Sequence, residues 1–78
     1  MDDKQIIKKF GLILKSLREQ RGLSQEALAH AINSHATHIS RLENGHKQPT
    51  LTTIFKIASV LKIEPIDMIK TLQDSLKK

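Results

Sequence analysis

Apolar residues recur three and four positions apart along most of this chain, and this periodicity limits the folds that it can adopt. Near the N-terminus, Ile6, Phe10, Ile13 and Leu17 follow one another at spacings of four, three and four. Side chains with this spacing lie on one face of an α-helix. Among dipeptides typical of β-hairpins, Asp-Gly is absent, and Asn44-Gly45 is better explained as the end of a helix. We therefore expect an all-α protein with five helices.

Residues that start and stop helices divide the chain into these five segments. Ser24 and Thr50 are typical N-cap residues, because their hydroxyls accept a hydrogen bond from a free backbone N–H of the first turn. Gly22 and Gly45 suit helix C-termini, where a positive φ is favoured, and Pro65 suits a first helical position. The expected helices are residues 3–21, 25–32, 36–44, a fourth that begins after Thr50, and 65–77.

The same periodicity predicts which side chains face the core of a compact five-helix domain. Aromatic residues make up only 3% of the chain, so this core depends on the packing of aliphatic side chains. Besides the N-terminal face given above, the expected inward residues are Ala27, Leu28, Ala31, Ile39, Leu42, Leu51, Ile54, Phe55, Ala58 and Leu61, followed on the last helix by Ile66, Ile69, Leu72 and Leu76.

Length and charge narrow the possible functions. Seventy-eight residues are enough for one domain, which we expect to span 1–78. The absence of cysteine excludes a disulfide framework and a thiolate metal site. A formal charge of +5 suits a polyanionic partner. No signal peptide or run of about 18 apolar residues is present, so we expect a cytoplasmic protein without a membrane partner.

Residues 24–45 read as two short helices joined by a tight polar turn, which is the pattern of a helix-turn-helix. In the second of these helices, Ile39 and Leu42 are the expected core residues. The other side of that helix carries short hydroxyl and methyl groups with a single guanidinium. Such groups can bond to base edges or contact the thymine methyl. The residues on this side are Ala36, Thr37, Ser40 and Arg41.

From Leu17 to Leu61 the chain resembles the phage-repressor and Cro-type (XRE) helix-turn-helix family. The matching pieces include Gly22-Leu23-Ser24-Gln25-Glu26, Leu42-Glu43-x-Gly45 and Ile57-Ala58-x-x-Leu61, and they align without a gap through the two-helix unit. The resemblance implies a lambda-repressor-like fold. It also implies a transcription regulator that binds double-stranded DNA without a cofactor or small-molecule ligand.

The resemblance also implies a role for each matching position. Ala36, Thr37, Ser40 and Arg41 occupy positions that read bases. Arg18 and Glu43 occupy positions of a structural ion pair. The positions that contact phosphate are Gln25, Asn44, Lys47, Gln48 and Thr50. We add His35 and His38 as phosphate contacts that protonation would strengthen.

Four residues depart from the family pattern. Asn33 replaces the usual turn glycine, Ser34 replaces a hydrophobic residue, and His35 is a poorer N-cap than Ser or Thr. Ala36 replaces a long polar reader, which leaves fewer direct hydrogen bonds to bases.

The apolar stripe of the last helix has two interpretations. Part of Ile66, Ile69, Leu72 and Leu76 must cover the core, and the remainder is a candidate surface for a homodimer that reads a palindrome. In short relatives such as restriction–modification controller proteins, a fifth helix dimerises. The alternative is that this helix only completes the core.

Other functional classes fit the sequence less well. No catalytic arrangement is evident, so we expect no enzyme. Four histidines, His30, His35, His38 and His46, cluster around the two-helix unit, but no carboxylate or thiol completes a set of metal ligands, so we expect no metal site. Two Phe and no Tyr or Trp disfavour RNA binding. An antitoxin-type protein-interaction module that also binds DNA for autoregulation remains the alternative function.

Overall fold

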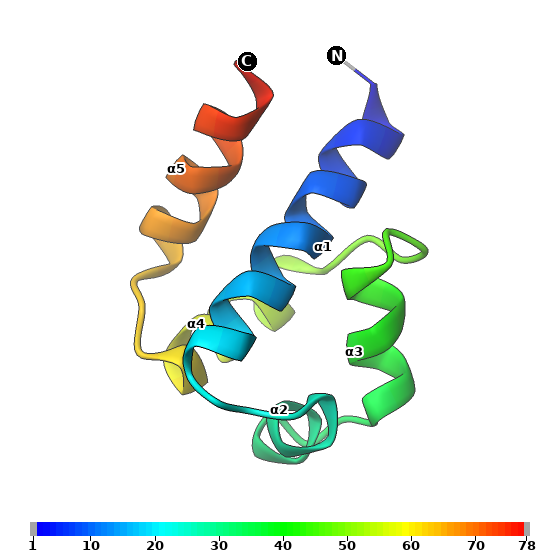
Figure 1. The fold of residues 1–78 in the computed structure, drawn as a ribbon, viewed down its shortest axis with the longest axis vertical. Helices are drawn as coiled ribbons and strands as arrows, with labels where there is room; N and C mark the ends of the chain where they lie inside the picture. The colour runs from blue at the N-terminus through cyan, green and yellow to red at the C-terminus, as the bar shows by residue number, and fades with distance from the viewer. Residues whose placement is uncertain (1, 78) are drawn as a thin grey trace.

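A computed structural model describes residues 2–77, and these residues form five helices and no strand. Met1 and Lys78, the ends of the expected domain, lie outside the described residues. The helices, coloured from blue to red in Figure 1, are α1 (Asp3–Gln20), α2 (Gln25–Ala31), α3 (Ala36–Glu43), α4 (Leu51–Leu61) and α5 (Pro65–Leu76). The expected all-α fold with five helices is confirmed.

The ends of the helices lie within about a residue of those predicted from the capping residues. The Ser24 hydroxyl accepts a hydrogen bond from the Ala27 N–H at 2.9 Å, as expected of an N-cap. Gly45 has a φ of 72°, and Asn33 takes the place of a turn glycine with a φ of 60°. His35 precedes α3 and makes no side-chain capping bond, which confirms that it is a poor N-cap.

The predicted inward face of α2 was partly wrong. Leu28 is buried as expected, but Ala27 and Ala31 are exposed and Ala29 is buried in their place. The turn that follows α2 folds back against Ala29, because the Ser34 N–H donates to the Ala29 carbonyl at 2.8 Å. Alanines occur on both sides of this short helix, so periodicity alone could not identify the buried one.

α4 and α5 are both rotated relative to the prediction. On α4 the buried residues are Ile54, Ile57, Ala58 and Leu61, whereas Leu51 and Phe55 are 71% and 56% exposed. On α5 only Met68 is fully buried, Leu72 packs partly against the core, and Ile66 and Ile69 are exposed. Both helices carry more apolar residues than one face can bury, so the spacing fits more than one rotation.

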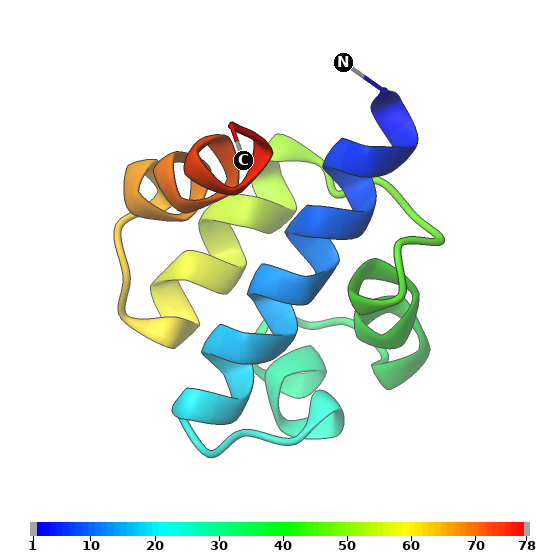
Figure 2. The same ribbon diagram turned by 45° about the horizontal axis from the view of Figure 1, so that its top comes forward.

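α1 is the central helix and packs against both α3 and α5. In Figures 1 and 2, α3 and α5 lie on opposite sides of α1. On the α1 face predicted from spacing, Phe10 is buried while Ile6, Ile13 and Leu17 are half-buried. Leu14, which that prediction omitted, is fully buried. The actual inward face is rotated toward α3.

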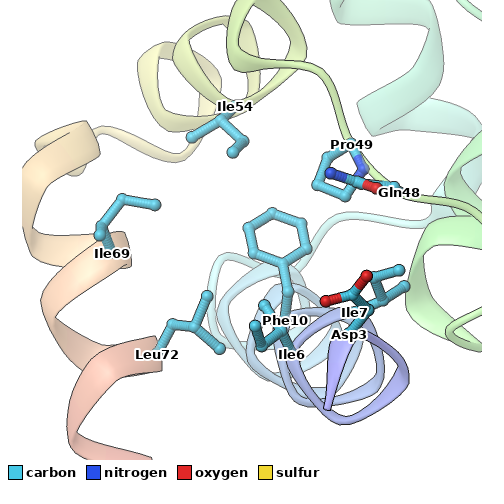
Figure 3. Close-up of a pocket in the computed structure, with 9 residues that line it drawn as sticks. All are labelled: Asp3, Ile6, Ile7, Phe10, Gln48, Pro49, Ile54, Ile69 and Leu72. Atoms are coloured by element: carbon cyan, nitrogen blue, oxygen red, sulfur yellow. The ribbon is translucent and has the colours of Figure 1, made fainter. Parts of the chain in front are cut away.

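The loop between α3 and α4 runs across the first turns of α1. Together with α1, α4 and α5, this loop borders an open pocket of about 250 Å³. Figure 3 shows Phe10 pointing into the middle of this pocket, between Ile69 on one side and Pro49 on the other. The lining is completed by Asp3, Ile6, Ile7, Gln48, Ile54 and Leu72. This part of the loop is therefore held against α1 by apolar contacts.

The crossing of α1 and α3 depends on Gly11. A Cβ atom at this position would lie 2.4 Å from the Leu42 carbonyl oxygen and 2.5 Å from that of Glu43. These neighbours are backbone atoms at the end of a packed helix, so they cannot yield as a flexible side chain would. Glycine therefore sets how closely the two helices approach.

We expect Gly11→Ala to destabilise the protein, although alanine is the better helix former. Overpacking should cost about 1–3 kcal/mol or more, which exceeds the roughly 1 kcal/mol that alanine gains in helix propensity. Ser16→Ala, an exposed change on the same helix, is the control. Urea unfolding gives the comparison, and a Gly11→Ala protein as stable as the wild type would show that α1 and α3 are not in close contact.

Candidate nucleic-acid interface

α3 has one buried side and one accessible side. Ile39 and Leu42 are completely buried and hold the helix in the core. On the other side, Thr37 and Arg41 are exposed, and Ala36 and Ser40 are half-buried. The four predicted base-reading residues thus share an accessible face, and the rotation of α3 about its axis is set by its two core residues.

A shallow hollow lies between the accessible side of α3 and the first turn of α2. The small side chain of Ala36 leaves this space open where a longer residue would fill it. The hollow is lined by Gln25, Glu26, Ala36, Thr37 and Ser40. A predicted phosphate-contacting residue and three predicted base-reading residues therefore border one surface depression.

A buried network connects the first three helices. The Arg18 Nε donates to Glu43 Oε2 at 2.6 Å, and its Nη2 donates to Glu43 Oε1 at 3.0 Å. The same guanidinium donates from Nη1 to the Leu23 carbonyl at 2.7 Å. Its hydrogen bond to Glu43 raises the pKa of Arg18 above the ordinary value, so the guanidinium stays charged. The structure thus contains the Arg18–Glu43 ion pair that the family resemblance implied.

Gln25 belongs to this network as well as to the surface. Its Nε2 donates to Glu43 Oε1 at 3.0 Å. One amide hydrogen is therefore bonded internally, and the half-buried side chain is held in one place at the edge of the hollow. A preorganised amide loses less conformational entropy when it binds a ligand than a free one does.

His35 and His38 lie at the N-terminal end of α3. His35 is exposed, whereas His38 is half-buried with its Nδ1 2.7 Å from the Ser34 hydroxyl. Burial lowers the pKa of His38 from its ordinary value, and the positive charges of Lys47, Arg41 and His35 lower it further. Without a bound anion, His38 is therefore neutral at pH 7, and Ser34 orients its ring.

The other predicted phosphate-contacting residues follow α3. Asn44 is the C-cap of α3, and Lys47 and Gln48 are exposed in the next loop. Thr50 caps α4, where its hydroxyl accepts from the Thr53 N–H at 3.1 Å and donates to the Thr53 Oγ1 at 2.9 Å. The Thr50 hydroxyl is thus used within the protein, and the Asn44 amide donates to the Ser40 Oγ at 3.3 Å, which leaves Lys47 and Gln48 better placed to bind a ligand.

No exposed carboxylate occurs between Ala27 and Thr50. The only acidic residue in this segment is Glu43, which is buried and paired with Arg18. Arg41, Lys47 and four histidines are the charged or chargeable groups that remain. A surface with this composition attracts polyanions, although the exposed carboxylate of Glu26 lies beside it at the edge of the hollow.

The helix-turn-helix family model HTH_3 matches residues 14–68. The match extends from the middle of α1 to the first turn of α5 and includes the whole interface described above. The chain belongs to this helix-turn-helix family. This is a family of DNA-binding transcription regulators and not of enzymes, and the matched residues include all of α2 and α3.

Control proteins are among the sequence relatives of this HTH_3 chain. It is 34% identical over 61 residues to control protein C.BamHI of Bacillus amyloliquefaciens, covering 77% of this chain and 75% of the relative. It is 32% identical over 57 residues to the ImmF control region 10 kDa protein of Bacillus phage phi105, covering 73% of this chain. The match spans 63% of the phage protein's length.

Solved structures of controller proteins have the same fold. The restriction–modification controller C.AhdI from Aeromonas hydrophila aligns with a TM-score of 0.83 and 35% identity, covering 87% of this chain and 99% of that one. The controller C.Esp1396I, crystallised as a tetramer with its natural 35-base-pair operator, aligns with a TM-score of 0.82 and 25% identity. That alignment covers 94% of this chain and 96% of the controller.

Sequence reasoning did not identify every residue of the HTH_3 surface. It missed Glu26, which lines the hollow, and Ser34, which orients His38. The spacing of four between Ser34 and His38 is the signal that could have found this pair. Nothing in the spacing indicated the bond between Gln25 and Glu43, because it joins residues on different helices.

No helix among residues 2–77 is long and apolar enough to span a bilayer.

Removing one member of the buried ion pair should be costly. We expect Glu43→Ala to lower the free energy of unfolding by about 3–5 kcal/mol, because it leaves the buried Arg18 guanidinium without a counter-charge. The double variant Arg18→Met/Glu43→Leu should cost less than this single change, because it leaves no unpaired charge. Asp74→Ala, an exposed change, is the control. A Glu43→Ala protein no less stable than this control would contradict the role of the pair.

Proposed function

We propose that this protein binds a palindromic operator in double-stranded DNA as a homodimer and thereby regulates transcription. One observation supports the proposal above all: α3 is fixed by Ile39 and Leu42 so that Thr37, Ser40 and Arg41 share an accessible face. Short side chains with donor and acceptor groups can approach base edges closely in a major groove. Residues beside this face supply the groups that would bind backbone phosphates.

Different base contacts are expected from different residues of α3. Arg41 can donate two hydrogen bonds to the O6 and N7 atoms of guanine, and Thr37 and Ser40 can bond to several bases. The methyl group of Ala36, at the edge of the hollow, can contact the thymine methyl group. Ala36 thus stands where family members carry a longer polar residue that reads bases. Base recognition here is left to the shape of this surface and to the guanidinium of Arg41.

Phosphate contacts would hold α3 in register with the groove. Gln25 at the start of α2, and Asn44, Lys47 and Gln48 after α3, are the residues that we assign to this role. His35 and His38 would join them when a nearby phosphate favours their protonated forms. Such contacts fix position but do not read sequence.

Exposed apolar residues support dimerisation through α5. Four of the five large hydrophobic residues exposed in the described chain belong to α4 and α5, and Ile66 is the most exposed at 74%. A pair joined along α5 would carry its two α3 helices on the outer sides, because α3 and α5 lie on opposite sides of α1 (Figure 1). The protein is 21–23 Å across in its shorter directions, a scale suited to grooves about 34 Å apart.

Selection of bound sequences from random duplex DNA should return a palindrome. Arg41→Ala should relax the preference at one position of each half-site at a cost of about 1–3 kcal/mol. Lys47→Ala should weaken binding to all sequences about equally and lower the salt slope by about one unit per subunit. If all duplexes bind the wild type equally at moderate salt, or if Arg41→Ala keeps the full preference, the assignment of α3 is wrong.

Sedimentation of the free protein at tens of micromolar should show a dimer. Ile66→Lys should weaken the dimer at least about tenfold, because burial of an isoleucine side chain contributes roughly 1.5–3 kcal/mol. Leu12→Lys is the matched control, since Leu12 is 57% exposed but lies on α1. A monomeric wild type, or equal effects of the two variants, would count against dimerisation through α5.

A further inference from the structure

The N-terminal half of α1 carries a pair of basic residues to which neither the helix-turn-helix nor the dimer surface assigns a role. Lys4 and Lys8 are both exposed. They are four residues apart on a helix, so their side chains are neighbours one turn apart. Asp2 and Asp3 are the acidic residues nearby in sequence. The Asp2 carboxylate accepts from the Lys4 N–H, and Asp3 lines the pocket between α1 and the loop.

This part of α1 is in direct contact with the loop that follows the recognition helix. A Cβ atom on Gly45 would lie 3.1 Å from the Cα of Lys8, so the two backbones approach closely. Farther along the loop, Gln48 and Pro49 line the same pocket as Asp3 and Ile7 (Figure 3). The loop thus approaches the backbone of α1 closely at Gly45, and at Gln48 and Pro49 it borders the same pocket as the first turns of α1.

The positive charge at the end of α3 is therefore adjacent to α1. Gly45 is two residues before Lys47, and the His46 N–H donates to the Arg41 carbonyl at 2.9 Å. The Lys8 backbone lies beside Gly45, which separates Arg41 from Lys47 in the sequence, and Lys4 is one helical turn closer to the N-terminus. No exposed carboxylate of the loop interrupts it, because residues 44–50 contain no acidic residue.

We propose that Lys4 and Lys8 form a second phosphate-binding surface, continuous with Lys47, that binds the DNA backbone beyond the segment contacted by the helix-turn-helix. This inference rests on the proposed function, because it needs DNA bound across α3. Each lysine that neutralises a phosphate releases condensed counterions, which contributes affinity without sequence preference. The contact would thus lengthen the footprint on each half-site and leave base reading unchanged.

The test is the salt dependence of binding to the selected operator. Lys8→Gln should lower the slope of log K against log salt by about 0.9 per subunit, and Lys4→Gln/Lys8→Gln by about twice that. Lys62→Gln and Lys62→Gln/Lys70→Gln are the matched controls. These lysines are also exposed, but they lie at the end of α4 and on α5, away from α3. Lys8→Arg, which keeps the charge, should restore the slope.

The possible outcomes separate this inference from the proposed function. Lower slopes for the α1 variants alone, with an unchanged selected sequence, would support the second surface. If Lys8→Gln behaves like Lys62→Gln while Arg41→Ala and Lys47→Ala act as predicted, the second surface is excluded and the proposed function stands. If the wild type shows no preference among duplexes, both proposals fail.

Discussion

The ion pair between Arg18 and Glu43 is the interaction on which the geometry of the candidate nucleic-acid interface depends. One guanidinium joins the end of α1 to the Leu23 carbonyl before α2 and to the carboxylate at the end of α3, and that carboxylate also accepts from Gln25. Buried ion pairs add little net stability over apolar substitutes, but their directional bonds permit few alternative arrangements. Here they restrict how far α3 can turn. The close contact at Gly11 restricts the same helix by excluded volume.

The structural roles of the helices follow from these constraints. α1 is in contact with both α3 and α5, so it links the accessible side of α3 to the exposed apolar residues of α5. A recognition helix needs a rigid support, because an error of a fraction of an ångström changes which base edges its side chains can reach. Completely buried residues such as Leu14 and Leu42 provide that support with aliphatic side chains, in a chain with almost no aromatics.

Local chemistry made the helix boundaries predictable, whereas the faces of the helices were less predictable. Ser24, Thr50 and Gly45 act through bonds and dihedral angles within a few residues, so the sequence reveals their roles. Leu51 and Phe55 have the right spacing for the core, but tertiary packing selected Ile57 and left them exposed. Periodicity and side-chain chemistry indicated the accessible side of α3. The phosphate-contacting positions came mainly from family resemblance, and the bond from Gln25 to Glu43 depends on a helix crossing that no local pattern encodes.

α5 has few fully buried side chains to attach it to the rest of the molecule. Met68 is its only fully buried side chain, and an open pocket separates part of α5 from α1. Segments with few buried contacts open at a lower free-energy cost than the core of a domain. α5 is thus the helix that can detach at the lowest free-energy cost while α1 to α4 stay packed together. A partner that binds the outer side of α5 would raise the free-energy cost of that opening by mass action. The fraction of molecules in which α5 stays packed on the domain would therefore rise with the concentration of the partner.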